Sequence, residues 1–348
     1  MVASMSSQYP HTITTPGKVV FLSLVMCIIL VCAMAIALVV GTVDVSFGHI
    51  MGIISGTLPT DDPVRLIIFK IRLPRIILAG LVGFSLSLGG IVFQAILRNP
   101  LADPFILGVS SGSACGAVLG IIFGFGFSVG IPVLSFVGAL LTIYLVMSLG
   151  ARRMGMESST ILLTGVIINA FFTAVIMFFI SISADERLHT MLFWLYGDLS
   201  QGQYGQLAFI APIVLVVFIW LYSLSKELNI ITTGDEIALQ LGVNVAATKK
   251  TALVLVSLLM GLVVAFSGLI GFVGLIVPHL ARMVFRTDHR LLIPIGSLGG
   301  AIFLIAADTL ARTLVSPSEL PVGVVTAFMG APFFILLLRK KGSQWSRS

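Results

Sequence analysis

The run VVFLSLVMCIILVCAMAIALVV, from Val19 to Val40, decides the class of fold, because it places 22 residues without a charge in a row. About 20 apolar residues are needed for a helix to cross a membrane. The run is longer than the roughly 7–15 apolar residues of a cleaved signal peptide, and Lys18 precedes it directly. We therefore predict that it is a retained transmembrane helix that begins on the cytoplasmic side.

Similar apolar runs fill the rest of the 348-residue chain. Hydrophobic residues make up 58% of it and charged residues only 10%, which excludes a soluble enzyme, a disordered chain and a nucleic-acid-binding domain. The runs are continuous rather than alternating, so they indicate helices and not a β-barrel. We predict an all-α polytopic membrane protein with about ten spans, at residues 19–40, 74–97, 104–124, 131–150, 159–182, 204–224, 246–267, 273–285, 291–311 and 321–338.

The basic residues predict how these spans are oriented. If the N-terminus is cytoplasmic, 14 of the 20 Lys and Arg residues fall on the cytoplasmic side, where membrane proteins carry such an excess. We therefore predict a polar N-terminal segment at residues 1–18, a transmembrane domain at 19–340 and a tail at 341–348, with both termini in the cytoplasm.

Two Gly–Pro pairs suggest a duplication. Gly90 precedes Pro100 by ten residues, and Gly268 precedes Pro278 by ten. Inverted repeats with Gly- and Pro-interrupted helices are common in transporters. We predict an inverted repeat of two five-helix halves, although a chance match in a Gly-rich chain also explains the spacing.

The stretch that ends with KIRLPR (Lys70–Arg75) gathers most of the basic residues of the opposite, outer side. Arg72 and Arg75 are three positions apart and can share a direction on a helix. Arginine binds carboxylates with two parallel hydrogen bonds. A cationic patch on this side therefore indicates either a docking surface for an acidic partner or contacts with lipid headgroups.

Arg312 lies between the last two predicted spans and has two interpretations. It either extends the external cationic patch or pairs with Asp308, four residues earlier on the same helix. Glu319, in the turn SPSELP, is another local partner.

The connection at about residues 225–250 is the largest polar insertion after the first outer loop. Thr233 and Glu236 have the spacing of a capping box, Gly242 fits the end of a short helix, and Asn244 fits the start of the next. The helix is too short to span a membrane. It carries three apolar residues beside its acids: Ile237, Leu239 and Leu241. It is either a knob for a groove on a cytoplasmic partner or a helix on the lipid interface.

The fifth span carries a polar stripe. Ser158, Gly165, Asn169 and Thr173 share one helical face. Such a face points to protein or to a wet cavity rather than to lipid. It either lines a pathway or makes hydrogen bonds between helices.

Several chemistries leave no trace in the sequence. A phosphate-binding G-x-x-x-x-G-K-[ST] motif does not occur, so the chain is not its own P-loop ATPase. The best acidic or histidine candidates within the spans, Asp308 and His279, are too few for a typical proton or sodium relay. The three cysteines have no metal-type spacing.

The chain closely resembles the FecCD family, the permease subunits of ABC importers for iron–siderophores, haem and vitamin B12. The resemblance runs from about Val39 to Arg339. Its most specific stretches are RLPR (Arg72–Arg75), GGIVFQAILRNPLADPFILGVSSG (Gly89–Gly112), GDEIALQLGV (Gly234–Val243), GFVGLIVPHLAR (Gly271–Arg282) and ELPVGVVTAFMGAPFFILLL (Glu319–Leu338).

This resemblance implies a non-enzymatic subunit in a prokaryotic inner membrane, without a cofactor or a metal site. Its partners would be two cytoplasmic ABC ATPase subunits, an external solute-binding protein, membrane lipid and a second permease subunit, as a homodimer or a pair of similar chains. It implies that Arg72, Arg75 and Arg312 receive acidic residues of the binding protein. It implies ATPase coupling by Gly234, Asp235, Glu236, Ile237, Ala238, Leu239, Leu241 and Gly242, and a cytoplasmic gate near Ser158 and Ser159.

The resulting hypothesis is a translocation pathway for a metal chelate, with iron–siderophore ahead of vitamin B12 and haem. Two hypotheses of another class stay open: an ion-coupled secondary transporter that works alone, and a non-transporting scaffold or receptor. The cytoplasmic connection and the scarcity of buried ionic residues favour the importer permease over both of these.

Overall fold

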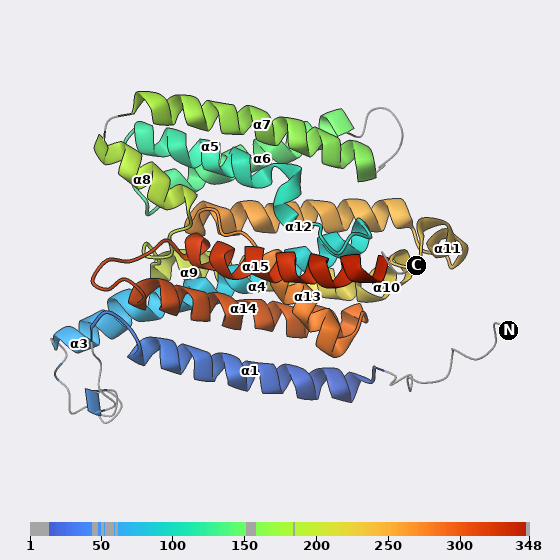
Figure 1. Cartoon of the computed structure of the whole chain (residues 1–348), viewed down its shortest axis with the longest axis horizontal. Coiled ribbons are helices and arrows are strands. Elements are labelled where there is room, and N and C mark those ends of the chain that lie inside the picture. Colours follow the sequence, from blue (N-terminus) through green and yellow to red (C-terminus); the bar gives the residue numbers. More distant parts are fainter. Residues whose placement is uncertain are drawn as a thin grey trace.

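The computed structural model describes residues 14–43, 62–150, 158–183 and 185–345, together with residues 48, 49, 52 and 59. Its described part is helical and contains no strand (Figure 1). The elements are α1 (Pro16–Val39), α3 (Pro63–Leu66), the π-helix η1 (Ile67–Arg72), α4 (Leu73–Ile96), the 3₁₀-helix η2 (Pro104–Leu107), α5 (Val109–Ile122), α6 (Gly130–Gly150), α7 (Ser158–Ile182), α8 (Asp185–Leu195), α9 (Tyr204–Ser223), α10 (Ser225–Ile231), α11 (Asp235–Gln240), α12 (Val245–Ser267), α13 (Val273–Phe285), α14 (His289–Thr313) and α15 (Val322–Trp345).

Every predicted span corresponds to a helix. Seven described helices are long and apolar enough to cross a membrane, and α5, α13 and the apolar part of α15 are shorter. The short eighth span, 273–285, has the predicted bounds. The third span differs, because Gly108 adopts a left-handed conformation with φ of 75° and separates η2 from α5.

Helix α8 was not predicted. Its 11 residues are too few to span a membrane, and its polar N-terminal half hides the apolar pattern. Met191 and Trp194 are buried, so the helix lies against the bundle.

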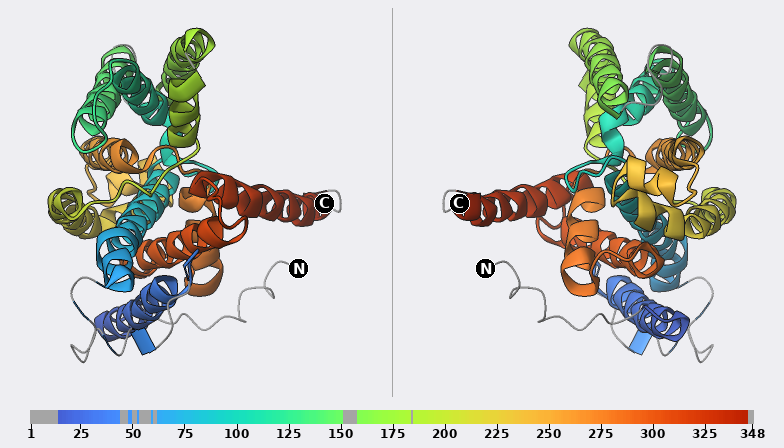
Figure 2. Two further views of the ribbon diagram at one scale, coloured as in Figure 1. Left: turned by 90° about the vertical axis from the view of Figure 1, so that its left-hand side faces the viewer. Right: turned by 90° about the vertical axis from the view of Figure 1, so that its right-hand side faces the viewer.

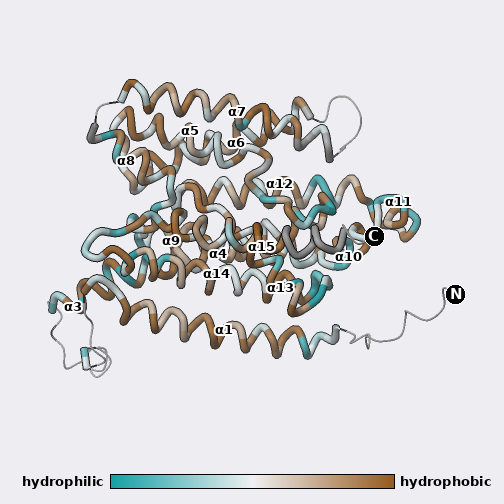
Figure 3. Tube along the Cα trace, in the orientation of Figure 1, coloured by the Kyte–Doolittle hydropathy of each residue, from teal (hydrophilic) through white to brown (hydrophobic). Residues whose placement is uncertain are grey.

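The spans lie side by side, so the bundle has two ends (Figure 1). Helix α1 begins and α15 ends at the end that carries α11, which we call the α11 end. We call the other end, where α3 lies, the arginine end. Apolar residues follow the helices along their length, and polar residues gather toward the two ends (Figure 3). This pattern is the one expected of a protein that crosses a bilayer.

Helix α4 is at the centre of the core. Leu78, Ile91 and Phe93 are fully buried in it. It packs closely on α14, because a Cβ atom at Gly83 would collide with the carbonyl oxygen of Gly300. Glycine at such crossings lets helix backbones approach in an apolar environment, where close packing drives association.

The inverted repeat stays a prediction, and the Gly–Pro spacing does not support it. Gly90 lies inside α4, whereas Gly268 follows the last residue of α12, so the two Gly–Pro pairs are not at equivalent places. The order of helix lengths does repeat. The third helix is the shortest in each of two series of five, α5 in the first and α13 in the second. The first series is α1, α4, α5, α6 and α7, and the second is α9, α12, α13, α14 and α15.

Helix α15 leaves the bundle at an angle, and α7 borders the same side (Figure 2). Both helices expose large apolar side chains. These residues are Leu163, Ile167, Phe171, Phe178, Phe328, Met329, Ile335 and Leu336.

Candidate functional site

At the arginine end, Arg72 is buried against the end of α1. Its Nη1 atom donates to the carbonyl oxygens of Leu38 and Val39, at 2.7 and 3.0 Å, and its Nη2 atom donates to that of Val43 at 2.5 Å. The last carbonyls of a helix have no partner within the helix and carry partial negative charge. Arg72 therefore neutralises the end of α1 and fixes it to the bundle.

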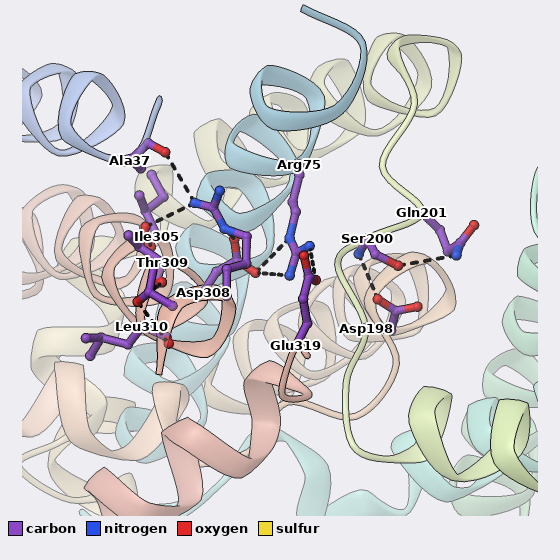
Figure 4. Close-up of polar contacts among 12 residues, drawn as sticks. Ala37, Arg75, Asp198, Ser200, Gln201, Ile305, Asp308, Thr309, Leu310 and Glu319 are labelled. Carbon is purple, nitrogen blue, oxygen red and sulfur yellow. Dashed lines mark hydrogen bonds and ion pairs between the residues drawn. The ribbon is translucent and has the colours of Figure 1, made fainter. Parts of the chain in front are cut away.

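Arg75 is also buried, but its partners are carboxylates (Figure 4). Its Nε atom donates to Asp308 Oδ1 at 3.0 Å, and its Nη2 atom lies 2.9 Å from the same oxygen. Its Nη1 atom donates to Glu319 Oε2 at 2.6 Å. One guanidinium thus joins α4 to α14 and to the connection between α14 and α15.

Arg312 completes this cluster. It is buried, its Nε atom lies 3.2 Å from Asp308 Oδ2, and its Nη2 atom donates to the carbonyl oxygen of Ala37 at 3.3 Å. Asp308 therefore stands between two arginines, Arg75 and Arg312. The local pair of Asp308 and Arg312, one of the two interpretations of the sequence, is present.

Arg72, Arg75 and Arg312 lie at one end of the bundle, but all three are buried rather than displayed on its surface. Arg72 and Arg75 do not share a direction either. Arg72 ends the wider turn of the π-helix η1, and Arg75 lies in the first turn of α4, so one faces α1 and the other faces α14. The role of these arginines in docking stays a prediction.

At the α11 end, a knob projects from the bundle (Figure 1). We use this name for residues 234–243, which contain α11. Leu241 exposes 64% of its surface, and Ile237 and Leu239 are exposed as well. Glu236 lies on the exposed side, whereas Ala238 is buried beneath α11 with Ile231, Val243 and Val245. The exposed apolar residues thus stand on a small core of their own.

Local caps end α11 and begin α12. Gly242, with φ of 83°, donates to Leu239 O, and Val243 donates to Ala238 O, which is a Schellman arrangement. The prediction that Gly242 ends the helix is confirmed. Asn244 caps α12 as predicted, since its Oδ1 atom accepts from the backbone N–H of Ala247 at 3.1 Å.

The predicted capping box is wrong. The Thr233 hydroxyl donates to the carbonyl oxygen of Ile230, so it belongs to the end of α10. Gly234, with φ of 136°, takes the capping position of α11 and offers no side chain. A left-handed backbone at this position favours glycine, whose missing Cβ removes the steric penalty.

Asp235 fixes the knob to the bundle. Its Oδ2 atom lies 2.6 Å from Lys249 Nζ on α12 and 4.0 Å from Arg98 Nη2 in the loop that follows α4. These two ion pairs connect α11 to α12 and to that loop.

A second joint, which the sequence analysis missed, connects α10 to α14. Asn229 Nδ2 donates to Asp288 Oδ1 at 2.8 Å, and Asn229 Oδ1 accepts from the backbone N–H of His289 at 2.8 Å. Burial raises the pKa of Asp288, but hydrogen bonds from Arg290 and Asn229 outweigh it and hold the pKa well below its usual range. Asp288 therefore stays charged at neutral pH. The only sequence signal is that Asp288 fits the N-cap of α14.

The residues of the predicted polar stripe on α7 differ in their exposure to solvent. Gly165 is buried, and its carbonyl oxygen lies 3.0 Å from where a Cβ atom of Gly108 would stand. Asn169 is exposed in the single subunit and Thr173 is half-buried. Ser158 and Ser159 begin α7, and their side chains lie outside the described part.

No group of three or more His, Cys, Asp or Glu side chains within the described residues is arranged to hold a metal ion.

The chain is similar to known membrane proteins along most of its length. A family model described as the FecCD transport family matches residues 28–340. The chain is 37% identical over 321 residues to the cobalamin import system permease protein BtuC of Halobacterium salinarum, which covers 88% of this chain and 86% of that protein. It is 40% identical over 292 residues to the hemin transport system permease protein HmuU of Yersinia pestis, which covers 82% and 87%.

A solved structure has the same fold. It is described as an inward-facing conformation of a metal-chelate type ABC transporter, and it is 35% identical, with a TM-score of 0.81 over 92% of this chain and 99% of that one. The family model covers residues 28–340 of 348, including the knob and the arginine cluster. The chain therefore belongs to the FecCD transport family.

Proposed function

We propose that this protein is the permease of a binding-protein-dependent ABC importer and forms the pathway for a metal chelate, iron–siderophore first, with vitamin B12 and haem as the alternatives. The family match over residues 28–340 carries this proposal. Relatives named for cobalamin and hemin support the substrate class. The charge distribution of the sequence supports the orientation, with the α11 end in the cytoplasm and the arginine end outside.

The knob is the contact for the cytoplasmic ATPase subunits. Exposed leucines on a rigid, capped helix fit an apolar groove on a partner better than a lipid surface, because α11 is attached at the end of the bundle by Asp235. The coupling residues are Gly234, Asp235, Glu236, Ile237, Ala238, Leu239, Leu241 and Gly242.

The arginine end is the docking site for acidic residues of the external binding protein, through Arg72, Arg75 and Arg312. Arg72 and Arg312 both donate to carbonyls at the end of α1, whereas Arg75 is held by carboxylates alone. A carboxylate from a partner can replace a carboxylate more readily than it can replace a helix end. Arg75 is therefore the central docking residue.

The pathway runs between two permease subunits, along α7. Helices α7 and α15 border one side of the bundle. Their exposed apolar side chains fit a second copy of the chain. Asn169 and Thr173, together with Ser158 and Ser159 at the start of α7, then border the pathway. Gly165 packs against Gly108 and supports the helix from within the subunit.

Reconstitution into vesicles tests the proposal. The chain is combined with its cognate ATPase and binding protein, and uptake of a ferric siderophore, vitamin B12 and haem is compared. We expect accumulation of one of them that depends on ATP and on the binding protein. Sustained uphill uptake by the chain alone under a sodium or proton gradient would instead establish a secondary transporter.

Docking is tested separately with Arg75→Ala. The variant should bind the loaded binding protein at least about tenfold more weakly, because it removes a charge-assisted contact. Arg75→Lys keeps the charge but not the planar guanidinium. Its affinity for the binding protein should lie between those of Arg75→Ala and the unsubstituted protein. Arg187→Ala is the matched control, since it removes an exposed arginine of α8 at the same end. Equal affinities for Arg75→Ala and the unsubstituted protein would disprove the docking role.

A further inference from the structure

We propose that Glu319 is an exchangeable internal ligand of Arg75. It occupies the guanidinium in the free permease and leaves when a carboxylate of the binding protein docks. This inference rests on the proposed function, and it adds a residue that competes with the partner for the same nitrogen atom.

The two carboxylates on Arg75 occupy different edges of its guanidinium. Asp308 holds the edge formed by Nε and Nη2, at 3.0 and 2.9 Å, whereas Glu319 holds Nη1 at 2.6 Å. Either contact can therefore be lost while the other stays intact.

The two carboxylates differ sharply in their access to solvent. The Asp308 side chain is 1% exposed and the Glu319 side chain is 37% exposed. Asp308 lies within α14 and also pairs with Arg312. Glu319 lies in the connection to α15, and its one ion pair within the described part of the chain is the pair with Arg75. Glu319 is thus the ligand that can move into water at low cost.

The charge of the cluster favours exchange over simple addition. Two arginines, Arg75 and Arg312, pair with two carboxylates, Asp308 and Glu319, so the cluster already has no net charge. An added carboxylate would face the charge of Glu319 at the same nitrogen. An exchange keeps every hydrogen bond of Arg75 and releases a carboxylate that is already partly hydrated, so its net cost is small.

Glu319→Gln tests this competition. The variant has nearly the same size but no charge, so it should bind the purified cognate binding protein about three- to tenfold more tightly. The matched control is Asp62→Asn, which removes one negative charge from the same end without touching Arg75 and still caps α3 at Val64. Its affinity should change less than about twofold. Glu319→Ala, which cannot hold Arg75 at all, should tighten binding at least as much as Glu319→Gln.

The outcomes separate this inference from the docking proposal. If Arg75→Ala weakens binding while neither Glu319 variant tightens it, docking stands and the exchange is wrong. If both Glu319 variants weaken binding, Glu319 belongs to the docking surface itself, and the exchange is again wrong. If Arg75→Ala and the Glu319 variants all bind normally, both ideas fall.

Discussion

Leu241 at the α11 end exposes 64% of its surface, whereas the Asp308 side chain at the arginine end exposes 1%. The apolar residue faces outward and the charged residues face inward, which reverses the usual distribution in a soluble protein. At the α11 end, a partner meets a finished surface. At the arginine end, a partner meets an internal network that must open or exchange a contact. The two ends therefore differ in how mutations should affect stability and binding.

The largest effect that this comparison predicts is at Asp308. Asp308→Asn leaves Arg75 and Arg312 buried with half of their compensating charge removed, so the free energy of unfolding should fall by about 3–5 kcal/mol. The measurement is denaturation of the purified protein in detergent. Glu319→Gln is the control within the same cluster, and it should cost less than about 1 kcal/mol because the Glu319 side chain is 37% exposed. Equal losses for the two variants would show that burial does not distinguish these carboxylates.

Asp103 extends the comparison to a carboxylate without a cationic partner among the described residues. It caps η2, and burial raises its pKa to about 6, partly opposed by the hydrogen bond from Phe105 N–H. The unfolded carboxyl titrates near 3.8. The folded protein therefore holds the proton more tightly, and stability is lost as pH rises from about 4 to about 6.

Asp103→Asn cannot ionise, and its amide oxygen can still accept from Phe105 N–H. It should be about 3 kcal/mol more stable than the unsubstituted protein near neutral pH and nearly equal to it near pH 4. Thermal melts across this range measure the difference. A constant difference at all pH values would mean that ionisation of Asp103 does not limit stability.

The sequence predicted the spans better than it predicted the arginine end, and the reason is physical. An apolar run is visible in the sequence without knowledge of its partners, so even the short α13 has the bounds expected from the sequence. The break at Gly108 is hidden because it lies within an apolar run. The burial of Arg75 depends on Asp308, 233 residues away in the chain, and no local pattern encodes that contact.

The knob could be predicted in part, because some of its contacts are local in sequence. Its C-terminal cap is local, and Gly242 was identified correctly. The joint between Asn229 and Asp288 spans 59 residues and was missed. Local chemistry is thus visible in the sequence, whereas long-range pairing of charges is visible only in the folded chain.

Leu241→Ser tests whether the knob is a binding surface rather than part of the core. Because the side chain is exposed, stability should change by less than about 0.5 kcal/mol. Binding to the cognate ATPase, measured by titration, should weaken about tenfold if the leucine fills an apolar pocket. The matched control is Leu314→Ser, at the opposite end of the bundle with 62% of its surface exposed. Equal effects of the two variants on ATPase binding would contradict the assignment of the knob.

Gly242→Ala tests the smallest and most local effect, the rigidity of the knob. With φ of 83°, an alanine at this position should cost about 1 kcal/mol. The cost should appear as faster hydrogen exchange of the Gly242 and Val243 amides, which donate to Leu239 and Ala238, and as about fivefold weaker ATPase binding.

Two further variants separate backbone strain at Gly242 from a general effect of the added methyl group. Gly242→Asn should lose less than Gly242→Ala, because asparagine tolerates the left-handed region better. Gly205→Ala, in α9 where a Cβ atom meets nothing within 4 Å, should not weaken ATPase binding. If Gly242→Ala exchanged its amides at the original rate yet still lost ATPase binding, contact with the methyl group would explain the loss. The Schellman cap would then stabilise α11 without determining how tightly the knob binds the ATPase. The α11 end and the arginine end would differ in the exposure of their binding residues, but not in how firmly those residues are held.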